Sequence, residues 1–422
     1  MAPGVPFCWL VSATLPIAWA NGGPEEGTIH PLAGLQSTVA PDGSSFTAAE
    51  VPLTCRIADL AQSQLSSSCA ILDLTHNALH SRPVSGNTTL DSNSTIRLLV
   101  EALKGANSPS SLLLSGSDLL GEQADGVTSD AFFAELAPAL RGLHTLALDG
   151  CNLTSLHVEA VVNSTLVPAS PLHTLSLARN HVGPLGATAI GRRLSEHSGG
   201  LSLASLQLTE TALGGEGSTA LSESISQGGG ASLVRLALDQ NGIGDDGAIE
   251  LGRALARARG GALRVLDLSG NGIGPRGVYS FAQSLAAADD ASRAAGLHEL
   301  YLSSNSAGGD GAEALASLIE RREHLHVLSV HDNAIPAAGA DALERALRRG
   351  RSLSRLTGLR HNDAWPGEVT SRIEAAVARN SDALARAGAA PLLAEAQPSL
   401  AKTFDGQAVE TPNSGAGAVG PL

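Results

Sequence analysis

The chain has 422 residues, of which 43% are hydrophobic but only 3% aromatic, and it carries a formal net charge of −14. Residues 1–230 hold 8 basic and 19 acidic residues, a surplus that repels phosphate backbones and argues against nucleic-acid binding. With so few aromatic residues, the core must consist of many small, similar layers of Leu, Ala, Val and Ile.

The first twenty residues have features of a secretory signal. Phe7–Ala20 is a mostly apolar run, too short to span a bilayer, and Ala18-Trp19-Ala20 supplies a small-x-small cleavage pattern. The run differs from a typical signal because no Lys or Arg precedes it and Pro16 interrupts it. We expect residues 1–20 to be removed and the chain to be secreted or extracellular, with a cytoplasmic location as the alternative. No other segment is long and apolar enough for a transmembrane helix.

Residues 21–68 are predicted to form an N-terminal segment that ends in a cap. Thr54–Leu65 has apolar residues at helical spacing, which predicts a short amphipathic helix over the first strand. Cys55 and Cys69 are predicted to close a short loop at this point with a disulfide, worth about 3 kcal/mol in the chain-entropy model.

A repeat occupies residues 69–363. Its pattern, L-x-x-L-x-L-x-x-N-x-I, recurs about ten times, and from Leu143 onward successive copies begin 28 to 34 residues apart. Such a constant period is typical of a repeat architecture. The clean copies are Leu172–Val182, Leu233–Ile243 and Leu263–Ile273; the last copy begins at Leu353 and loses the register near Gly358.

Each residue type in the pattern has a predicted place. The Leu residues, such as Leu236, Leu238, Leu266 and Leu268, alternate along short strands and are expected to be buried between repeats. The Asn lies where the chain leaves the strand, and its amide can satisfy backbone groups that would each cost about 1 to 3 kcal/mol if left unpaired. Cys151 occupies this column and is predicted to be a buried, unreactive thiol. The column also contains Ser117 and Thr211, and its Asn residues are Asn77, Asn180, Asn241, Asn271, Asn305 and Asn333.

A helix is predicted after each strand. The motif G-A-x-x-L-x-x-A-L, as in Gly247–Leu255, has its apolar residues at helical spacing, and the small Gly-Ala pair allows close packing on the sheet. A repeat of this length with a full helix resembles the ribonuclease-inhibitor-like subclass of leucine-rich repeats. Similar repeats are found in Ran GTPase-activating proteins and in the sensor regions of innate-immunity receptors. The resemblance implies an α/β solenoid shaped as a horseshoe, with a parallel concave sheet of ten strands and convex helices.

The C-terminal part is predicted to close the repeat array. Pro366 opens a capping helix within residues 364–387, with Val369, Ile373 and Val377 on one face. Residues 388–422 are rich in Ala, Pro, Gly and Ser without a period, and are predicted to be a disordered tail.

The sequence also contains a glycine-rich dinucleotide-binding pattern and N-glycosylation sequons. Gly242–Gly247 and Gly272–Gly277 satisfy the dinucleotide pattern G-x-G-x-x-G, but they recur in phase with the repeat and serve its strand-to-helix turns.

N-glycosylation sequons occur at Asn87, Asn93, Asn152 and Asn163. Asn87 and Asn93 lie in the extra length of the first repeat, where a secreted chain tolerates a glycan.

Histidines occupy the second position in two pairs of adjacent repeats: His144 with His173, and His298 with His326. Parallel strands lie about 5 Å apart, so each pair should lie side by side. Two imidazoles at this distance can share a metal, but without an evident third ligand we favour solvated side chains and predict no metal site. The sequence also lacks C-x-x-C, H-E-x-x-H, G-x-S-x-G and a phosphate loop with Lys, so we predict no enzyme and no cofactor.

The leading interpretation is a non-catalytic scaffold that binds a protein partner on the concave face. The resemblance to Ran GTPase-activating proteins implies the alternative of a GTPase-activating regulator, although the acidic tail typical of that family is missing. A structural extracellular matrix or wall protein is the third class.

The docking site is predicted at the C-terminal end of the concave face. The third, fifth, seventh and eighth positions of each repeat should face away from the buried Leu residues, and Tyr301 is the only aromatic residue of the fifth column. If the histidines lie in the contact, binding should change between about pH 5.5 and 7.5. The predicted partner-binding residues are His298, Glu299, Tyr301, His326, His331, Asp332 and Arg355.

Overall fold

A computed structural model of the chain describes residues 53–55, 69–74, 83–84, 88–89, 99–101, 103, 109–116, 136–197, 199–258, 260, 262–289, 292–350, 352–358, 362 and 365–386. Thr47–Ala383 form one compact unit, and of a second unit, Met1–Phe46 with Leu384–Leu422, only residues 384–386 are described. The predicted signal at residues 1–20, the sequons Asn87 and Asn93, and the predicted tail at 388–422 lie outside the described residues.

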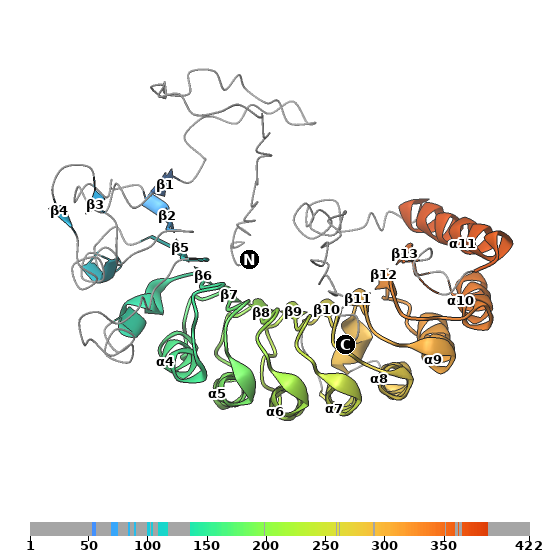
Figure 1. Cartoon of the computed structure of the whole chain (residues 1–422), viewed down its shortest axis with the longest axis horizontal. Coiled ribbons are helices and arrows are strands. Elements are labelled where there is room, and N and C mark those ends of the chain that lie inside the picture. Colours follow the sequence, from blue (N-terminus) through green and yellow to red (C-terminus); the bar gives the residue numbers. More distant parts are fainter. Residues whose placement is uncertain are drawn as a thin grey trace, which may run out of the picture. The chain divides into compact units, whose positions relative to one another are not determined.

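A single parallel sheet runs through the Thr47–Ala383 unit, with its strands in sequence order (Figure 1). Most strands have three residues, and each pairs with its neighbours in the register that the repeat predicts, as in Leu236↔Leu266. A separate antiparallel pair is formed by β3 (Pro83–Val84) and β4 (Thr88–Thr89). The strands of the sheet are β1 (Leu53–Cys55), β2 (Cys69–Asp73), β5 (Ser111–Leu113), β6 (Thr145–Ala147), β7 (Thr174–Ser176), β8 (Ser205–Gln207), β9 (Arg235–Ala237), β10 (Val265–Asp267), β11 (Glu299–Tyr301), β12 (Val327–Ser329) and β13 (Arg355–Thr357).

The sheet has eleven strands among the described residues, not ten, because β1 precedes the repeats. The predicted helix from Thr54 is therefore wrong at its start: Thr54 and Cys55 are extended and pair with β2. An edge strand exposes unpaired N–H and C=O groups, which an added strand satisfies directly. In this register Cys55 lies opposite Leu72, whereas Cys69 lies opposite Leu53. The register does not favour the predicted disulfide, whose side chains lie outside the described residues.

A helix follows each strand from β6 to β13. Figure 1 shows α4 to α10 on the outer side of the curved stack and the strands on its inner side, as predicted. The additional residues of the repeat that begins at Leu263 form the 3-10 helix η2 (Arg293–Gly296), and another 3-10 helix, η1 (Ala137–Gly142), precedes β6. The helices are α4 (Ser155–Thr165), α5 (Gly183–Glu196), α6 (Gly214–Ser226), α7 (Gly244–Arg257), α8 (Pro275–Ala287), α9 (Gly308–Arg321), α10 (Ala337–Arg349) and α11 (Gly367–Arg386).

The core lies between the sheet and the helices. Leu236, Leu238, Leu266 and Leu268 are buried, as predicted. The glycine of the Gly-Ala pair allows the close approach of successive repeats: a Cβ added at Gly247 would lie 2.6 Å from Ile243 Cγ2 and 3.1 Å from Ser218 Cβ of the preceding repeat. Close contact of this kind repeats along the helices, so the core is one continuous stack of small layers.

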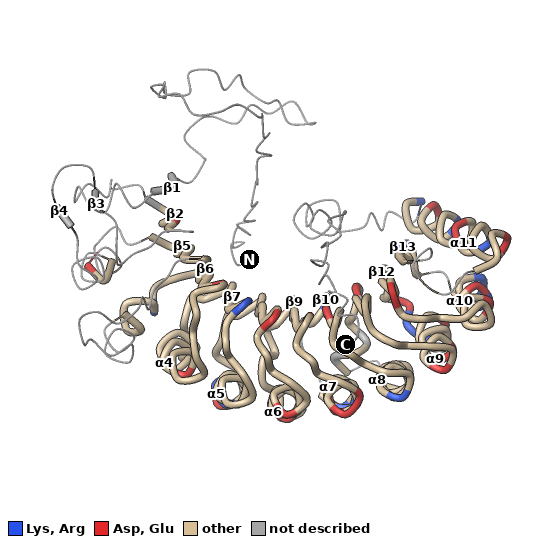
Figure 2. The backbone as a smooth tube through the Cα atoms, in the orientation of Figure 1, with Lys and Arg blue, Asp and Glu red and all other residues tan. Residues whose placement is uncertain are grey.

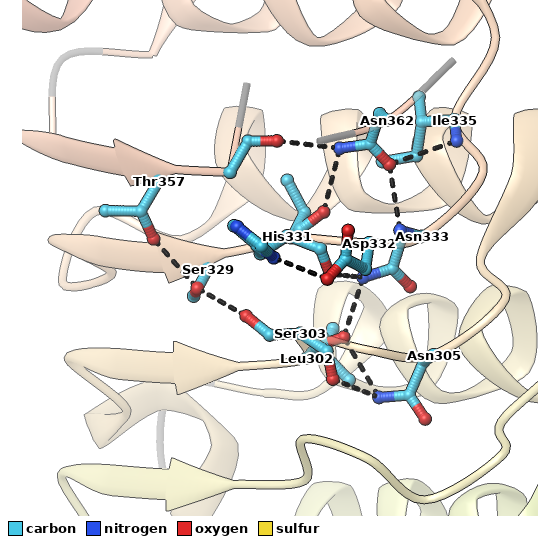
Figure 3. Close-up of polar contacts among 12 residues, drawn as sticks. Leu302, Ser303, Asn305, Ser329, His331, Asp332, Asn333, Ile335, Thr357 and Asn362 are labelled. Carbon is cyan, nitrogen blue, oxygen red and sulfur yellow. Dashed lines mark hydrogen bonds and ion pairs between the residues drawn. The ribbon is translucent and has the colours of Figure 1, made fainter. Parts of the chain in front are cut away.

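The Asn column forms a hydrogen-bonded ladder between repeats. Asn271 Oδ1 accepts from the backbone N–H of Asn241 at 2.9 Å and of Ile243 at 3.3 Å in the preceding repeat, and Asn271 Nδ2 donates to Leu238 O at 3.0 Å. Equivalent bonds link Asn305, Asn333 and Asn362 (Figure 3). Each repeat thus supplies a side chain that satisfies buried backbone groups of the repeat before it.

Cys151 and Thr211 occupy the Asn position in two repeats and make only part of the Asn hydrogen bonds. Cys151 is buried, and its Sγ donates to Leu114 O at 3.2 Å, a contact that resembles that of the Asn amide. Thr211 Oγ1 donates to Leu208 O at 2.7 Å, but Thr211 has no amide oxygen to offer the N–H groups of Asn180 and Val182.

Gly358 explains the lost register of the last repeat. It adopts a left-handed φ of +91°, and a Cβ there would lie 2.3 Å from His331 Cα. Asn362, one residue beyond the position that the repeat spacing predicts, takes the Asn role. Asn362 Oδ1 accepts from Asn333 N at 2.9 Å and from Ile335 N at 3.1 Å. The ladder therefore continues to the last strand.

Exchanging Thr and Asn within this column should change stability in opposite directions. Thr211→Asn keeps a similar volume and adds an acceptor for two backbone N–H groups, so we expect a gain of about 1 kcal/mol in the free energy of unfolding. The matched change Asn271→Thr removes such an acceptor and should cost about 1 to 3 kcal/mol. Urea unfolding measures both; a Thr211→Asn variant that is less stable than wild type would contradict the ladder.

Candidate functional site

The predicted docking residues lie on three adjacent strands and the turns beside them. Pairing aligns Glu299 with Val327 and Arg355, and Tyr301 with Ser329 and Thr357. His298 and His326 directly precede β11 and β12, whereas His331 and Asp332 lie in the turn after β12. The repeat therefore brings together residues up to 57 positions apart, from His298 to Arg355.

Glu299 has a different environment from the one predicted. Its side chain is buried rather than presented to a partner, and its carboxylate accepts a hydrogen bond from Tyr301 Oη at 2.8 Å. Val265 and Val327, at the same position of the neighbouring repeats, are also buried, whereas Arg355 at this position of the last repeat is exposed. Glu299 therefore positions Tyr301.

Tyr301 is a half-buried phenol on the inner face. Burial raises its pKa, and the hydrogen bond to Glu299 and the charge of that carboxylate raise it further. The ring is therefore neutral at physiological pH and fixed by its hydroxyl, which suits an amphipathic contact residue.

Three imidazoles gather beside these strands. The rings of His298 and His326 have centroids 5.3 Å apart in an edge-to-face arrangement, and His324 stacks on His298 at 6.1 Å. The pair was predicted, whereas His324 was missed because it belongs to the loop before the repeat consensus.

The turn after β12 carries a polar pair, His331 and Asp332. His331 Nδ1 lies 2.8 Å from Asp332 Oδ2, and the two side chains are 38% and 54% exposed. Nearby, Ser329 Oγ contacts Ser303 Oγ at 2.7 Å and accepts from Thr357 Oγ1 at 2.8 Å (Figure 3). These hydroxyl contacts join the repeats of β11, β12 and β13. Of the predicted docking residues, Asp332 and Arg355 are the exposed charged ones.

Sequence reasoning also missed a pair of carboxylates on the inner face. Burial and the charge of Asp267 together raise the pKa of Asp239 to about 6, opposed by the Thr209 hydroxyl, which donates to Asp239 Oδ1 at 2.7 Å. Burial also raises the pKa of Asp267, opposed by the N–H of Ser269 and the charge of Arg235. Their signal in the sequence is two Asp at the fifth and seventh positions of successive repeats.

In the N-terminal half of the inner face, polar side chains form hydrogen bonds with one another. Asp149 accepts hydrogen bonds from Ser115 Oγ at 3.1 Å and from Ala178 N at 3.0 Å, and it also holds the Ser176 hydroxyl. Ser176 is buried, although the alternation predicted an outward-facing side chain. Apart from the His144–His173 pair and the exposed Arg179, this half offers mainly small side chains.

Charged residues lie mainly on the outer helices, with fewer along the inner side (Figure 2). Among the described residues, no group of three or more His, Cys, Asp or Glu is arranged to hold a metal ion. In the same part of the chain, no helix combines the length and apolar character that crossing a bilayer requires.

Comparison with known proteins agrees with this architecture. A family model described as a leucine-rich repeat matches residues 170–191, 231–252 and 263–282, which contain the clean copies of the pattern. The chain is a leucine-rich-repeat protein. Its subclass stays a prediction. A search of curated proteins finds no significant match.

Solved structures with similar folds are distant. The leucine-rich repeat-containing protein LegL7 from Legionella pneumophila is 16% identical, with a TM-score of 0.45 over 77% of this chain and 98% of that one. Leiomodin-1 actin-binding site 2 is 15% identical, with a TM-score of 0.34 over 40% and 91%. The tropomodulin C-terminal domain of Caenorhabditis elegans is 16% identical, with a TM-score of 0.29 over 37% and 91%. Likeness at this level carries no argument about partners.

The buried carboxylate Asp239 should make stability depend on pH. Its folded pKa of about 6 exceeds the value of about 3.9 of an unfolded Asp. Between these values the folded chain holds the extra proton, so stability falls as the pH rises through this window. Asp239→Asn should therefore melt above wild type at pH 7, and the gap should close toward pH 4.

The control is Asp310→Asn, which removes an exposed carboxylate from the first turn of α9. Thermal unfolding followed by circular dichroism at pH 4, 5, 6 and 7 separates the two. An equal effect of Asp239→Asn at pH 4 and pH 7 would rule out the raised pKa.

Proposed function

We propose that the chain is a non-catalytic scaffold that holds a protein partner on the inner sheet face over β11, β12 and β13. The observation that carries the proposal is the contrast along this face. Its N-terminal half consists mainly of small residues bonded to one another and carries the histidine pair His144 and His173, whereas β11 to β13 combine their imidazoles with Tyr301 and Arg355. A leucine-rich-repeat fold suits a binding scaffold, because an open sheet presents side chains without enclosing a substrate.

Tyr301 and Arg355 are the proposed anchors. Interface energy concentrates in a few Tyr, Trp and Arg side chains, and truncating one typically costs about 2 kcal/mol or more. Tyr301 is pre-oriented by Glu299, so it loses little side-chain freedom on binding. Arg355 is exposed on β13, the last strand of the sheet. His331 and Asp332 belong to the rim of the same surface.

The test compares matched double variants. Tyr301→Ala with Arg355→Ala should reduce capture of the native partner at least tenfold, by the anchor energy above. Thr174→Ala with Arg179→Ala changes an intermediate and an exposed residue in the repeat of β7 and should leave capture unchanged. Arg355→Glu is the second test, because it reverses a charge without disturbing the Tyr301–Glu299 bond. Quantitative pull-down is read beside melting curves; equal loss from both double variants would remove the site from this face.

We also propose that the chain acts outside the cell. The apolar run Phe7–Ala20 and its Ala18-x-Ala20 site support entry into the secretory pathway. The expected mature N-terminus is Asn21, with sugar at Asn87 or Asn93. N-terminal sequencing and glycosidase treatment of the chain purified from its native cells test this; an intact Met1 with no mass shift would refute it.

A further inference from the structure

A row of nitrogen-bearing side chains precedes strands β10, β11 and β12. Arg264, His298 and His326 occupy the second position of three successive repeats, and His324 stacks on His298. We call these four residues the entry edge. The two outer rings lie 5.3 Å and 6.1 Å from the His298 ring, so His298 stands at the centre of the group.

Hydrogen bonds fix which nitrogen of two rings can titrate. His298 Nδ1 lies 2.7 Å from Gly296 O, and His326 Nδ1 lies 3.0 Å from Ser352 O. A carbonyl oxygen only accepts, so Nδ1 carries the hydrogen in both rings and the lone pair is on Nε2. Each ring therefore gains its proton at Nε2, which changes from an acceptor into a charged donor.

The insertion in the repeat that begins at Leu263 builds this arrangement. Its 3-10 helix η2 ends at Gly296, whose carbonyl accepts both His298 Nδ1 and Arg264 Nη1, the latter at 3.0 Å. The shared acceptor holds a permanent positive charge beside the central imidazole. His144 of the other histidine pair is likewise preceded by a 3-10 helix, η1, so the contact of Arg264 with Gly296 is what distinguishes the entry edge from that pair.

The charged groups around His298 are mostly cationic. Arg264 faces it from the β10 side, His326 from the β12 side and His324 from the loop after α9. Burial lowers the pKa of His298, and the charges of these three groups lower it further, against the hydrogen bond to Gly296. Among carboxylates nearby in the sequence, Glu299 is buried and bonded to Tyr301, and Glu323 is exposed in the loop. Arg355 adds a further exposed cation on β13.

We propose that the entry edge binds a carboxylate-rich segment of the protein partner and takes up protons as it does so. The inference deepens the proposed function and rests on it. A bound carboxylate accepts from the Nε2–H that protonation creates, and its charge relieves repulsion among the cations. Binding and protonation therefore favour each other, and affinity rises as the pH falls from about 7.5 to 5.5.

An acidic peptide fits this edge better than a single phosphate. The donors stand in a row at the strand spacing of about 5 Å rather than converging on one point. A row needs several anionic groups in a line, which successive Asp or Glu side chains of an extended segment supply. A compact phosphate would engage only one part of the row.

The experiment titrates the full chain with a fluorescent Asp-rich peptide at pH 5.5, 6.5 and 7.5 and constant low ionic strength. Asp stays ionised throughout, with an ordinary pKa of about 3.9. We expect binding at least about tenfold tighter at pH 5.5 than at 7.5. Calorimetry in two buffers of different ionisation enthalpy should show net proton uptake at pH 6.5. An Asn-rich peptide of the same length should not bind.

The matched variants use both histidine pairs. His298→Gln with His326→Gln should abolish the pH dependence. His144→Gln with His173→Gln alters rings stacked at 5.8 Å in equivalent positions and should behave as wild type. Equal affinity at pH 5.5 and 7.5, or the same loss from both double variants, would overturn the proposal. Proton-linked binding of inorganic phosphate as strong as that of the peptide would also overturn it, because the site would then take a small anion.

Failure here is distinguishable from failure of the proposed function. If Tyr301→Ala with Arg355→Ala abolishes partner capture while the peptide binds without pH dependence, the docking face stands and the acidic-segment proposal falls. If those variants leave capture intact, the docking face itself is wrong.

Discussion

The hydrogen bonds from each Asn side chain to the backbone of the preceding repeat are the constraint on which the structure depends. Asn241 N and Ile243 N lie in a buried turn and find their acceptor on Asn271, in another repeat. No repeat can satisfy its own turn alone, so burial of the Leu layers and satisfaction of the backbone are achieved together. This coupling explains why such a repeat is marginal in isolation and stable in a stack.

The ladder also decides how the inner face is built. Because it holds successive repeats in one register, residues at the same position become neighbours although about thirty residues separate them. The imidazoles of His298 and His326 and the hydroxyls of Ser329 and Thr357 meet in this way. Ser303 with Ser329, and Asp239 with Asp267, instead join the seventh position of one repeat to the fifth position of the next. A side chain on the inner face therefore has its neighbours in the repeats before and after its own, and one substitution changes its contacts with both repeats.

The repeat made the sheet, the helices and the buried Leu residues predictable, because period and alternation directly encode which face is covered. Features outside the consensus were not predictable. Strand β1 depends on an open sheet edge, and Asn362 takes its place through the turn at Gly358. For the candidate site, the pattern placed Tyr301 and Arg355 within three neighbouring strands but could not predict that Glu299 is buried. His324 and the role of Gly296 depend on loops and an insertion, where spacing carries no information about contacts.

The three-residue length of the strands from β5 to β13 sets the dimensions of anything that docks on them. At about 3.3 Å per residue, the flat part of the inner face is roughly 10 Å wide, whereas each added repeat lengthens it by about 5 Å. The surface is thus a narrow ribbon that grows in one direction only. Gain or loss of a whole repeat would change the length of this docking surface in fixed steps without altering its width. The surface can therefore be matched to a partner through the number of repeats as well as through its side chains.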